Sequence, residues 1–296
     1  MKKLQQSVKR SRKDNREVWK FTIFSILLSS VFLLYPIIYS IYLSLHSMQG
    51  LSSTFVGLGN YVRMLQDPVF RQALFNNFLF LIFQVPIMLV LGLILAFILN
   101  SPRLKGRTFF CLALFLPSVT SLVSYAVLFR MMFQIGGVVN DFLMTIGILD
   151  FPIDWLNSTF WARVLVVVAL CWRWTGYNMI FYLAGLQNIS KDILEAAQID
   201  GASTAQTLFQ VVIPQLKPVI LFTSITSTIG TLQLFDEVVN LTGGGPANAT
   251  LTAAQLIYKH SFVFTSNFGY SATLSWALVV IVALLSVIQM KVTNRR

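Results

Sequence analysis

Long apolar runs separated by short polar intervals constrain this chain more than any other feature. Six runs are long enough to cross a bilayer as helices, at about 21–45, 76–99, 109–132, 162–186, 219–239 and 271–290. Inside a hydrocarbon layer, only helices and closed barrels satisfy all their own backbone polar groups. We therefore predict an all-α membrane protein with six transmembrane helices, in which residues 21–296 form the membrane domain.

Composition agrees with this prediction and narrows the chemistry. The chain is 56% hydrophobic and 11% charged, whereas soluble domains are about one quarter charged. Its two cysteines, Cys111 and Cys171, fall inside apolar runs, so neither a disulfide framework nor a C-x-x-C metal site is expected. The two histidines, His46 and His260, lie far apart at polar edges and are interpreted as surface residues. We expect no metal site and no catalytic residues.

Basic residues indicate the topology. The formal net charge is +11, and if both termini are cytoplasmic the inner segments hold 16 of the 22 basic residues. Eight of these lie in the tail at 1–20, three at 101–107, two at 190–218 and three at 291–296. Cytoplasmic loops of membrane proteins carry such an excess. We predict that both termini are cytoplasmic and that the charge faces anionic membrane lipid, not nucleic acid.

The polar interval at 190–218 carries two sets of helix signals. Ser190 is placed to N-cap a short helix, and Gly201 follows where a left-handed residue ends one. Ser203 with Gln206 forms a capping box that starts a second helix, which we expect Pro214 to end. The pattern predicts a cytoplasmic helix-turn-helix, and a plain connecting loop is the simpler interpretation of it.

This interval resembles a known coupling motif. Glu195-Ala196-Ala197, Gly201 and Ile213-Pro214 with Pro218 are similar to the EAA loop of permease subunits of bacterial ATP-binding-cassette (ABC) importers. The resemblance implies the type I ABC importer permease fold in the bacterial plasma membrane. It also implies that the loop at 188–218 docks on a cytoplasmic ATPase. The implied coupling residues are Glu195, Ala196, Ala197, Asp200, Gly201 and Pro214.

Further motifs resemble the carbohydrate-uptake branch of these permeases, and its maltose and lactose F-type subunits in particular. They are Phe55–Leu58, Asn60-Tyr61, Leu116-Pro117, Trp172–Tyr177, Leu183–Gln187, Phe235-Asp236 and Thr242–Pro246. The resemblance implies a heterodimer with a second permease, two ATP-binding subunits and an extracellular solute-binding protein that delivers a sugar. No G-x-x-x-x-G-K-[ST] loop occurs in the chain, so we expect the ATPase to hold ATP and Mg and this chain to need no cofactor.

Three runs supply candidate residues for the sugar pathway. The fourth run carries Trp174, Tyr177 and Asn178, and a sugar ring stacks its C–H face on aromatic rings. The fifth run repeats hydroxyls every four residues, with Ser227 and Thr231 the pathway candidates; helix packing explains such a stripe equally well. The third run adds Ser118, Ser121 and Tyr125.

Arg173 needs a partner because a charge in a membrane span is costly. We predict a structural ion pair with Asp236.

Two alternatives remain open at this point. A membrane-embedded enzyme, such as a lipid-modifying transferase, would need paired carboxylates or a His-rich cluster at one membrane face, and the sequence offers neither. If the chain is a transporter, we expect a neutral sugar as its solute, because no basic cluster lies at mid-membrane to bind an anion. Uptake of amino acids, glycerol phosphate or another small polar solute is the alternative.

Overall fold

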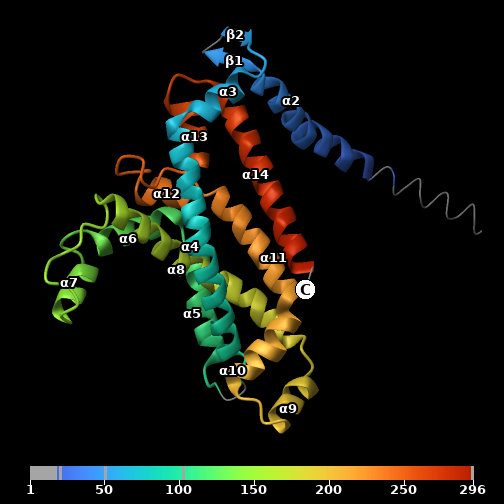
Figure 1. The fold of residues 1–296 in the computed structure, drawn as a ribbon, viewed down its shortest axis with the longest axis vertical. Helices are drawn as coiled ribbons and strands as arrows, with labels where there is room; N and C mark the ends of the chain where they lie inside the picture. The colour runs from blue at the N-terminus through green and yellow to red at the C-terminus, as the bar shows by residue number, and fades with distance from the viewer. Residues whose placement is uncertain (1–18, 20–21, 50–51, 102–103, 295–296) are drawn as a thin grey trace, which may run out of the picture. The chain divides into compact units, whose positions relative to one another are not determined.

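The computed structural model describes Trp19 and residues 22–49, 52–101 and 104–294 (Figure 1). Within them, six helices are long and apolar enough to cross a membrane: Thr22–Ser44, Pro68–Leu99, Leu122–Thr145, Thr159–Gln187, Thr204–Leu232 and Phe268–Thr293. The six-helix prediction is therefore confirmed. The predicted basic tail at 1–20 lies outside the described residues except for Trp19, whose side chain is exposed.

The chain forms two compact units. The first comprises Met1–Met64 with His260–Trp276, and the second comprises Leu65–Lys259 with Ala277–Arg296. The first span contains η1 (Ser30–Leu34) and α2 (Tyr35–Ser44), and the last span is α14 (Phe268–Asn294), which follows η3 (Lys259–Val263).

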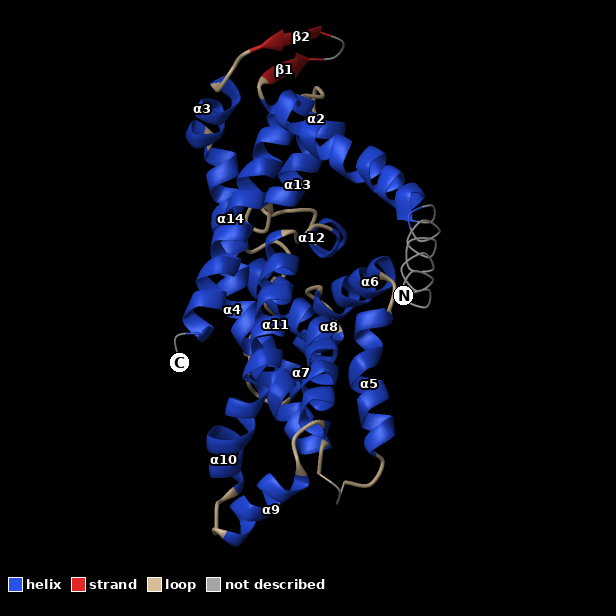
Figure 2. Cartoon of the chain, turned by 90° about the vertical axis from the view of Figure 1, so that its right-hand side faces the viewer, coloured by secondary structure: helices blue, strands red, loops and turns tan. Residues whose placement is uncertain are grey.

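A β-hairpin that the sequence did not indicate lies in the first unit (Figure 2). Strand β1 (His46–Gln49) pairs antiparallel with β2 (Ser52–Phe55), and α3 (Gly59–Gln66) follows. The side chain of Asn60 donates hydrogen bonds of 2.9 Å to the backbone oxygens of Ser44 and His46. These bonds tie α3 to the point where the first span becomes the hairpin.

His46 is buried, so its interpretation as a surface residue was wrong. Its Nδ1 lies 2.8 Å from the carbonyl oxygen of Tyr42, and its ring centroid lies 4.1 Å from that of Tyr42 and 5.2 Å from that of Phe55. The cause is the hairpin, which folds Phe55 back over the end of α2.

The second unit is built on two long helices, α4 (Pro68–Leu99) and α8 (Thr159–Gln187), which pack along each other. Helix α5 (Arg107–Val119) packs on α8 at Gly176, where a Cβ atom would come within 1.8 Å of the Leu114 carbonyl oxygen. Only glycine, which has no Cβ atom, therefore allows α5 to lie this close to α8. The unit also contains two short helices, α7 (Val138–Thr145), which forms the end of the span at Leu122–Thr145, and α13 (Ala253–Tyr258).

The third apolar run is not one helix, contrary to expectation. It divides into α5 and α6 (Leu122–Phe133), and Thr120 between them is extended, with ψ of 151°. Pro117 removes a backbone donor near the end of α5, and the Thr120 hydroxyl donates to the Pro117 carbonyl oxygen at 2.7 Å. Arg173 of α8 then donates to the carbonyl oxygens of Pro117, Ser118 and Thr120 at 3.1–3.4 Å. The arginine thus satisfies backbone groups that the break exposes.

Pro214 does not end the second helix of the polar interval, as the sequence analysis expected. Helix α10 (Thr204–Gln206) continues through η2 (Thr207–Val212) into α11 (Ile213–Leu232), and Pro214 lies at the start of α11. A proline in the first turn of a helix removes no hydrogen bond that the helix needs. The wider i→i+5 turns of η2 precede it, so the helix passes Pro214 without stopping.

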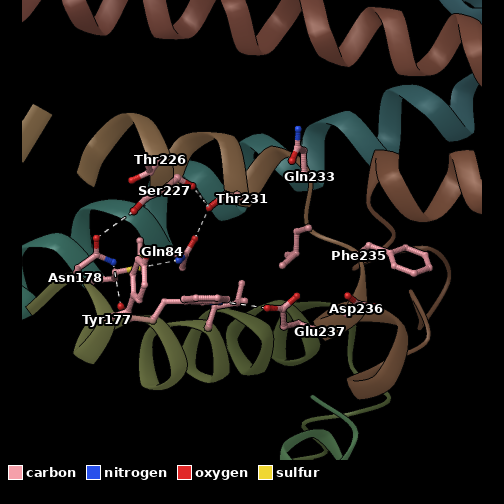
Figure 3. A pocket seen from close by; sticks show the side chains of 15 residues that line it. Gln84, Tyr177, Asn178, Thr226, Ser227, Thr231, Gln233, Phe235, Asp236 and Glu237 are labelled. Atoms are coloured by element: carbon pink, nitrogen blue, oxygen red, sulfur yellow. Dashed lines mark hydrogen bonds between the residues drawn. The ribbon is translucent and has the colours of Figure 1, made fainter. Parts of the chain in front are cut away.

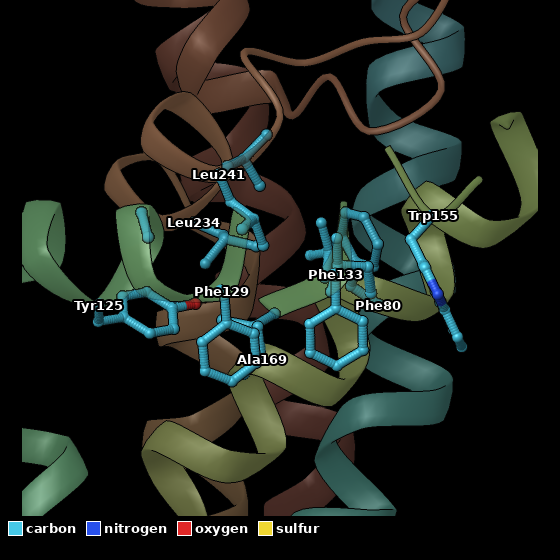
Figure 4. Packing of buried hydrophobic residues seen from close by; sticks show 13 residues of the cluster. Phe80, Tyr125, Phe129, Phe133, Trp155, Ala169, Leu234 and Leu241 are labelled. Carbon is cyan, nitrogen blue, oxygen red and sulfur yellow. The ribbon is translucent and has the colours of Figure 1, made fainter. Parts of the chain in front are cut away.

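The fifth membrane helix runs from Thr204 to Leu232, whereas the sequence predicted 219–239. It therefore begins and ends earlier than expected. The chain then turns through Leu234 into the short helix α12 (Asp236–Leu241). Leu234 and Leu241 join an apolar cluster with residues of α4, α6 and α8, including Phe80, Phe129, Phe133 and Ala169 (Figure 4). This cluster fixes α12 against the ends of the long helices.

Candidate functional site

A cavity of about 550 Å³ lies within the second unit, between α4, α8, α11 and α12 (Figure 3). The lining residues are Gln84, Met88, Leu170, Trp174, Tyr177, Asn178, Thr226, Ser227, Gly230, Thr231, Gln233, Leu234, Phe235, Asp236 and Glu237. Five of the predicted pathway residues, Trp174, Tyr177, Asn178, Ser227 and Thr231, therefore share one cavity. The helical spacing that suggested these five residues does place them in one cavity. Their role in a sugar pathway stays a prediction.

Hydrogen bonds between helices hold the polar wall in place. The hydroxyl of Thr231 donates to Oε1 of Gln84 at 2.8 Å, which links α11 to α4. The hydroxyl of Ser227 lies 3.4 Å from Oδ1 of Asn178, whose amide nitrogen donates to the Trp174 carbonyl oxygen at 3.0 Å. Side chains that already have partners within the chain are preorganised. Each of these groups retains capacity for a further hydrogen bond.

The aromatic wall comes from α8. Trp174 and Tyr177 lie edge to face, with ring centroids 5.7 Å apart and an interplanar angle of 88°. Tyr177 is 39% exposed and Trp174 is half-buried, so both rings remain accessible. Rings beside hydroxyl and amide groups provide an apolar face and polar edges, which is the combination that small polar ligands with apolar faces require.

Glu237 is the buried charge of the cavity. Its Oε1 accepts a hydrogen bond of 3.2 Å from Nε1 of Trp174 and lies 4.0 Å from Nε of Arg173. The predicted partner of Arg173, Asp236, is exposed, so that prediction was wrong by one position. Successive residues on a helix point in different directions, and α12 presents Glu237, not Asp236, to α8.

The three candidates from the third run lie away from the cavity lining. Ser118 donates to the Phe115 carbonyl oxygen at 2.7 Å, and Ser121 is exposed at the start of α6. Tyr125 is buried, with its ring stacked 5.9 Å from that of Trp172. The break between α5 and α6 redirects these side chains, so helical spacing across it could not place them.

The predicted coupling loop is built as its capping signals indicate. Gly201 ends α9 (Lys191–Ile199) with φ of 77°, and the Ala202 amide donates to the Ala197 carbonyl oxygen at 2.9 Å, closing a Schellman motif. Ser203 and Gln206 form the capping box in both directions. Glu195, Ala196, Asp200, Gly201 and Pro214 are exposed, and Ala197 is half-buried.

Apolar side chains are also exposed on this loop. Ile199 is 86% exposed and Phe209 is 66% exposed. Sequence reasoning did not single them out. The available signal was their position, because both are large apolar residues in the polar interval at 190–218, outside the predicted spans. Exposed apolar residues beside polar ones are typical of a surface that contacts another protein.

Sequence reasoning also missed Gln84 and Glu237 in the cavity. The signal for both was present, because an amide or a carboxylate inside a long apolar run marks a functional position in membrane proteins. Gln84 lies in the middle of α4, and Glu237 lies within the run first assigned to the fifth span.

Six membrane-length helices, a polar cavity and an exposed loop between two spans define a membrane transport protein. Residues 68–293 match the family model of the binding-protein-dependent transport system inner membrane component. The chain belongs to this family, which comprises the permease subunits of ABC importers. It is a multi-pass protein of the bacterial inner membrane and a transport component. The enzyme alternative is therefore rejected.

Relatives agree across almost the whole chain. It is 53% identical over 280 residues to the lactose transport system permease protein LacF of Rhizobium radiobacter, covering 94% of each chain. It is 36% identical over 263 residues to the arabinooligosaccharides transport system permease protein AraP of Halalkalibacterium halodurans, covering 88% of this chain and 82% of the relative. Each relative is described as a permease.

Solved structures confirm the fold. A bacterial ABC transporter that imports the acidic polysaccharide alginate has a chain that matches with a TM-score of 0.82 and 21% identity, covering 97% of this chain and 99% of that one. A bacterial alginate ABC transporter in complex with an alginate pentasaccharide-bound periplasmic protein matches with a TM-score of 0.84 and 21% identity. The predicted type I ABC importer permease fold is therefore confirmed.

Proposed function

We propose that this chain is one of two permease subunits of an importer for a neutral oligosaccharide, with lactose the first sugar to test. The relatives described above are permeases for lactose and arabinooligosaccharides, which supports a sugar as solute. An extracellular solute-binding protein delivers the sugar, and a second permease completes the pathway.

The observation that carries this proposal is the chemistry of the cavity. Trp174 and Tyr177 of α8 offer aromatic rings, while Gln84 of α4, Asn178 of α8 and Thr231 of α11 offer amide and hydroxyl groups. A sugar has an apolar C–H face and a rim of hydroxyls, so it complements both kinds of group. The stated volume of about 550 Å³ is within the range of sites for small ligands.

Uptake of glycerol phosphate is the weaker alternative. A phosphate needs cationic side chains or a helix N-terminus directed at it. Among the described residues, the cavity lining includes two acids, Asp236 and Glu237, and no lysine, arginine or histidine. The lining therefore disfavours an anionic solute such as glycerol phosphate. The shared fold with an alginate importer carries no information about the solute.

Energy reaches the pathway through the loop at 188–218 in this proposal. Two cytoplasmic ATPase subunits bind ATP and Mg, and the exposed residues Glu195, Ala196, Asp200 and Gly201 contact one of them, with Ala197 and Pro214 shaping the two helices. The exposure of Ile199 supports such a contact, because a soluble loop without a partner would leave this side chain in water.

Uptake of radiolabelled lactose tests the proposal. The chain is expressed with its partner permease, its ATPase and its binding protein in cells without other lactose uptake. We expect Trp174→Ala and Tyr177→Ala to lower uptake at least fivefold with the complex still assembled. Phe32→Ala, which removes a 70% exposed ring from the first span, is the matched control. Normal uptake in both cavity variants would contradict the proposed site.

Labelling tests the proposed topology, in which both termini and the coupling loop are cytoplasmic. In a chain carrying Cys111→Ser and Cys171→Ser, a membrane-impermeant thiol reagent applied to spheroplasts should label Ala247→Cys. It should leave Ser203→Cys unlabelled until the membrane is opened. Labelling of Ser203→Cys from outside contradicts the topology.

A further inference from the structure

The lining of the cavity is acidic, which its proposed role as a sugar site does not explain. Its lining combines hydroxyl, amide and aromatic groups with two carboxylates, those of Asp236 and Glu237. Among the described residues no cation lines it. A neutral sugar needs hydroxyl and amide partners, and it does not require a buried carboxylate.

Arg173 forms an ion pair with Glu237, but it is not among the residues that line the cavity. Its Nη1 and Nη2 atoms donate to the carbonyl oxygens of Pro117, Ser118 and Thr120, at the break between α5 and α6. Only Nε approaches Glu237, at 4.0 Å, and Nε itself has no hydrogen-bond partner. The arginine therefore keeps Glu237 in place while directing its own donors away from the cavity.

The carboxylate is held with one oxygen left free. Oε1 accepts from Nε1 of Trp174 and faces Arg173, whereas Oε2 makes no hydrogen bond within the described part of the chain. The side chain of Glu237 is 10% exposed, so the cavity is where it meets solvent. Figure 3 shows it beside the cavity, at the end of the aromatic wall.

We infer that Glu237 sets the charge specificity of this cavity: it accepts a hydroxyl of a neutral sugar and repels anionic solutes such as uronic acids and sugar phosphates. The inference rests on the proposed function and adds the solute class that the site rejects. An anion beside Glu237 meets a like charge with little water between, where repulsion is strong. A hydroxyl group instead donates to the free oxygen in a charge-assisted hydrogen bond.

A matched pair of ligands tests the inference without the selectivity of a binding protein. Methyl β-galactoside and methyl β-galacturonide differ only in carrying a CH₂OH or a carboxylate group at C6. Their binding to the purified permease complex in nanodiscs is measured by saturation-transfer NMR. We expect the wild-type complex to bind the galactoside at least tenfold more tightly, and Glu237→Gln to reduce this preference to less than threefold.

Controls separate charge from disruption of the fold. Asp141→Asn removes an exposed acid of α7 outside the cavity and should leave the preference unchanged. If Glu237→Gln fails to assemble, Gln233→Lys adds a cation at an exposed position of the lining and should tighten galacturonide binding at least threefold.

Two outcomes overturn the inference in different ways. An unchanged preference in Glu237→Gln shows that Glu237 does not set the charge specificity, while the sugar site stands. Where Gln233→Lys replaces that variant, an unchanged preference shows that charge in the lining does not set the preference, which overturns the inference as well. Failure of the wild-type complex to bind either ligand removes the sugar site itself, and the inference with it.

Discussion

The cavity and the coupling loop are organised in opposite ways. In the cavity, the polar side chains of Gln84, Thr231 and Glu237 have partners on other helices of the same chain. On the loop, Glu195 and Asp200 are exposed, and no side-chain hydrogen bond or ion pair within the described part of the chain involves them. The backbone of the loop is nevertheless fixed by capping. The chain thus supplies partners for the polar side chains of its cavity, whereas it leaves those of Glu195 and Asp200 exposed.

This difference predicts how mutations act. A change in the cavity region removes contacts that the fold itself needs, so it should affect both stability and transport. A change on the loop surface removes nothing that the isolated chain uses, so it should affect coupling alone. The predictions that follow run from the largest expected effect to the smallest.

Arg173→Ala should have the largest effect, on the stability of the complex. It leaves the carbonyl oxygens of Ser118 and Thr120 without the donor that Arg173 supplies, leaves that of Pro117 with the Thr120 hydroxyl, and leaves Glu237 without a nearby cation. Removing one partner of a buried ion pair costs about 3–5 kcal/mol. We expect a clear loss of purified complex and a lower melting temperature. Arg173→Lys, which keeps the charge but not the planar fork of donors, should recover only part of the loss. A normal melting temperature in Arg173→Ala would contradict the claim that the fold needs the contacts of the cavity region.

Gly201→Val should lower sugar uptake at least tenfold. Its φ of 77° is left-handed, and a β-branched residue there costs about 1–2 kcal/mol, which tilts α9 against α10. No atom lies within 4 Å of the position of a new Cβ, so steric clash does not explain any loss. Gly201→Asn is the matched control, because asparagine tolerates this conformation and should retain most of the uptake. Equal losses of uptake in both variants would mean that any side chain on the loop surface at this position impairs uptake, whatever backbone conformation it adopts.

The loop could be predicted from the sequence because its signals are local. Ser203 and Gln206 are three residues apart, and the left-handed Gly201 lies two residues after the last residue of α9. The cavity could be predicted only in part. Trp174, Tyr177 and Asn178 share one helix, but Gln84 meets Thr231 across 147 residues of sequence, and no local pattern records that contact.

The break in the third run shows the limit of hydropathy most clearly. Residues 109–132 are predominantly apolar, so their composition predicts a single span. The chain breaks near Thr120, just after Pro117, and Arg173, on another helix, supplies donors for the exposed carbonyl oxygens. Ser118, Ser121 and Tyr125 were placed by helical spacing across that break. Their positions therefore depended on a contact that the sequence does not display.

Glu195→Ala should have an intermediate effect, limited to coupling. Its carboxylate is exposed on α9, and a charge-assisted hydrogen bond to a partner is worth about 1.5–3 kcal/mol. We expect sugar-stimulated ATP hydrolysis in proteoliposomes to fall by three- to tenfold. The melting temperature of the permease should stay unchanged, and so should sugar capture by the binding protein. A loss of permease stability would show that Glu195 has a role within the chain, contrary to the comparison.

Ser203→Ala should have the smallest effect and resolves whether the order of the loop belongs to this chain alone. The Ser203 hydroxyl accepts from the Gln206 amide at 3.3 Å, and the Ser203 amide donates to Oε1 of Gln206 at 2.8 Å. Loss of such an N-cap costs about 1 kcal/mol, which is enough to fray the first turn of α10 but not to unfold a transmembrane helix. We expect faster amide hydrogen exchange at 204–207 and less than a threefold loss of uptake.

Gln206→Ala removes the reciprocal half of the same box and is the matched variant. If the box acts as a unit, the double variant should exchange little faster than either single variant, because the first substitution has already removed the shared turn. The decisive comparison is between the free permease and the complex with its ATPase. Slow exchange at these amides in the free wild-type permease means that capping alone orders the loop. If protection appears only when the ATPase is bound, the partner imposes the order, and the chain does not prepare its docking surface in advance.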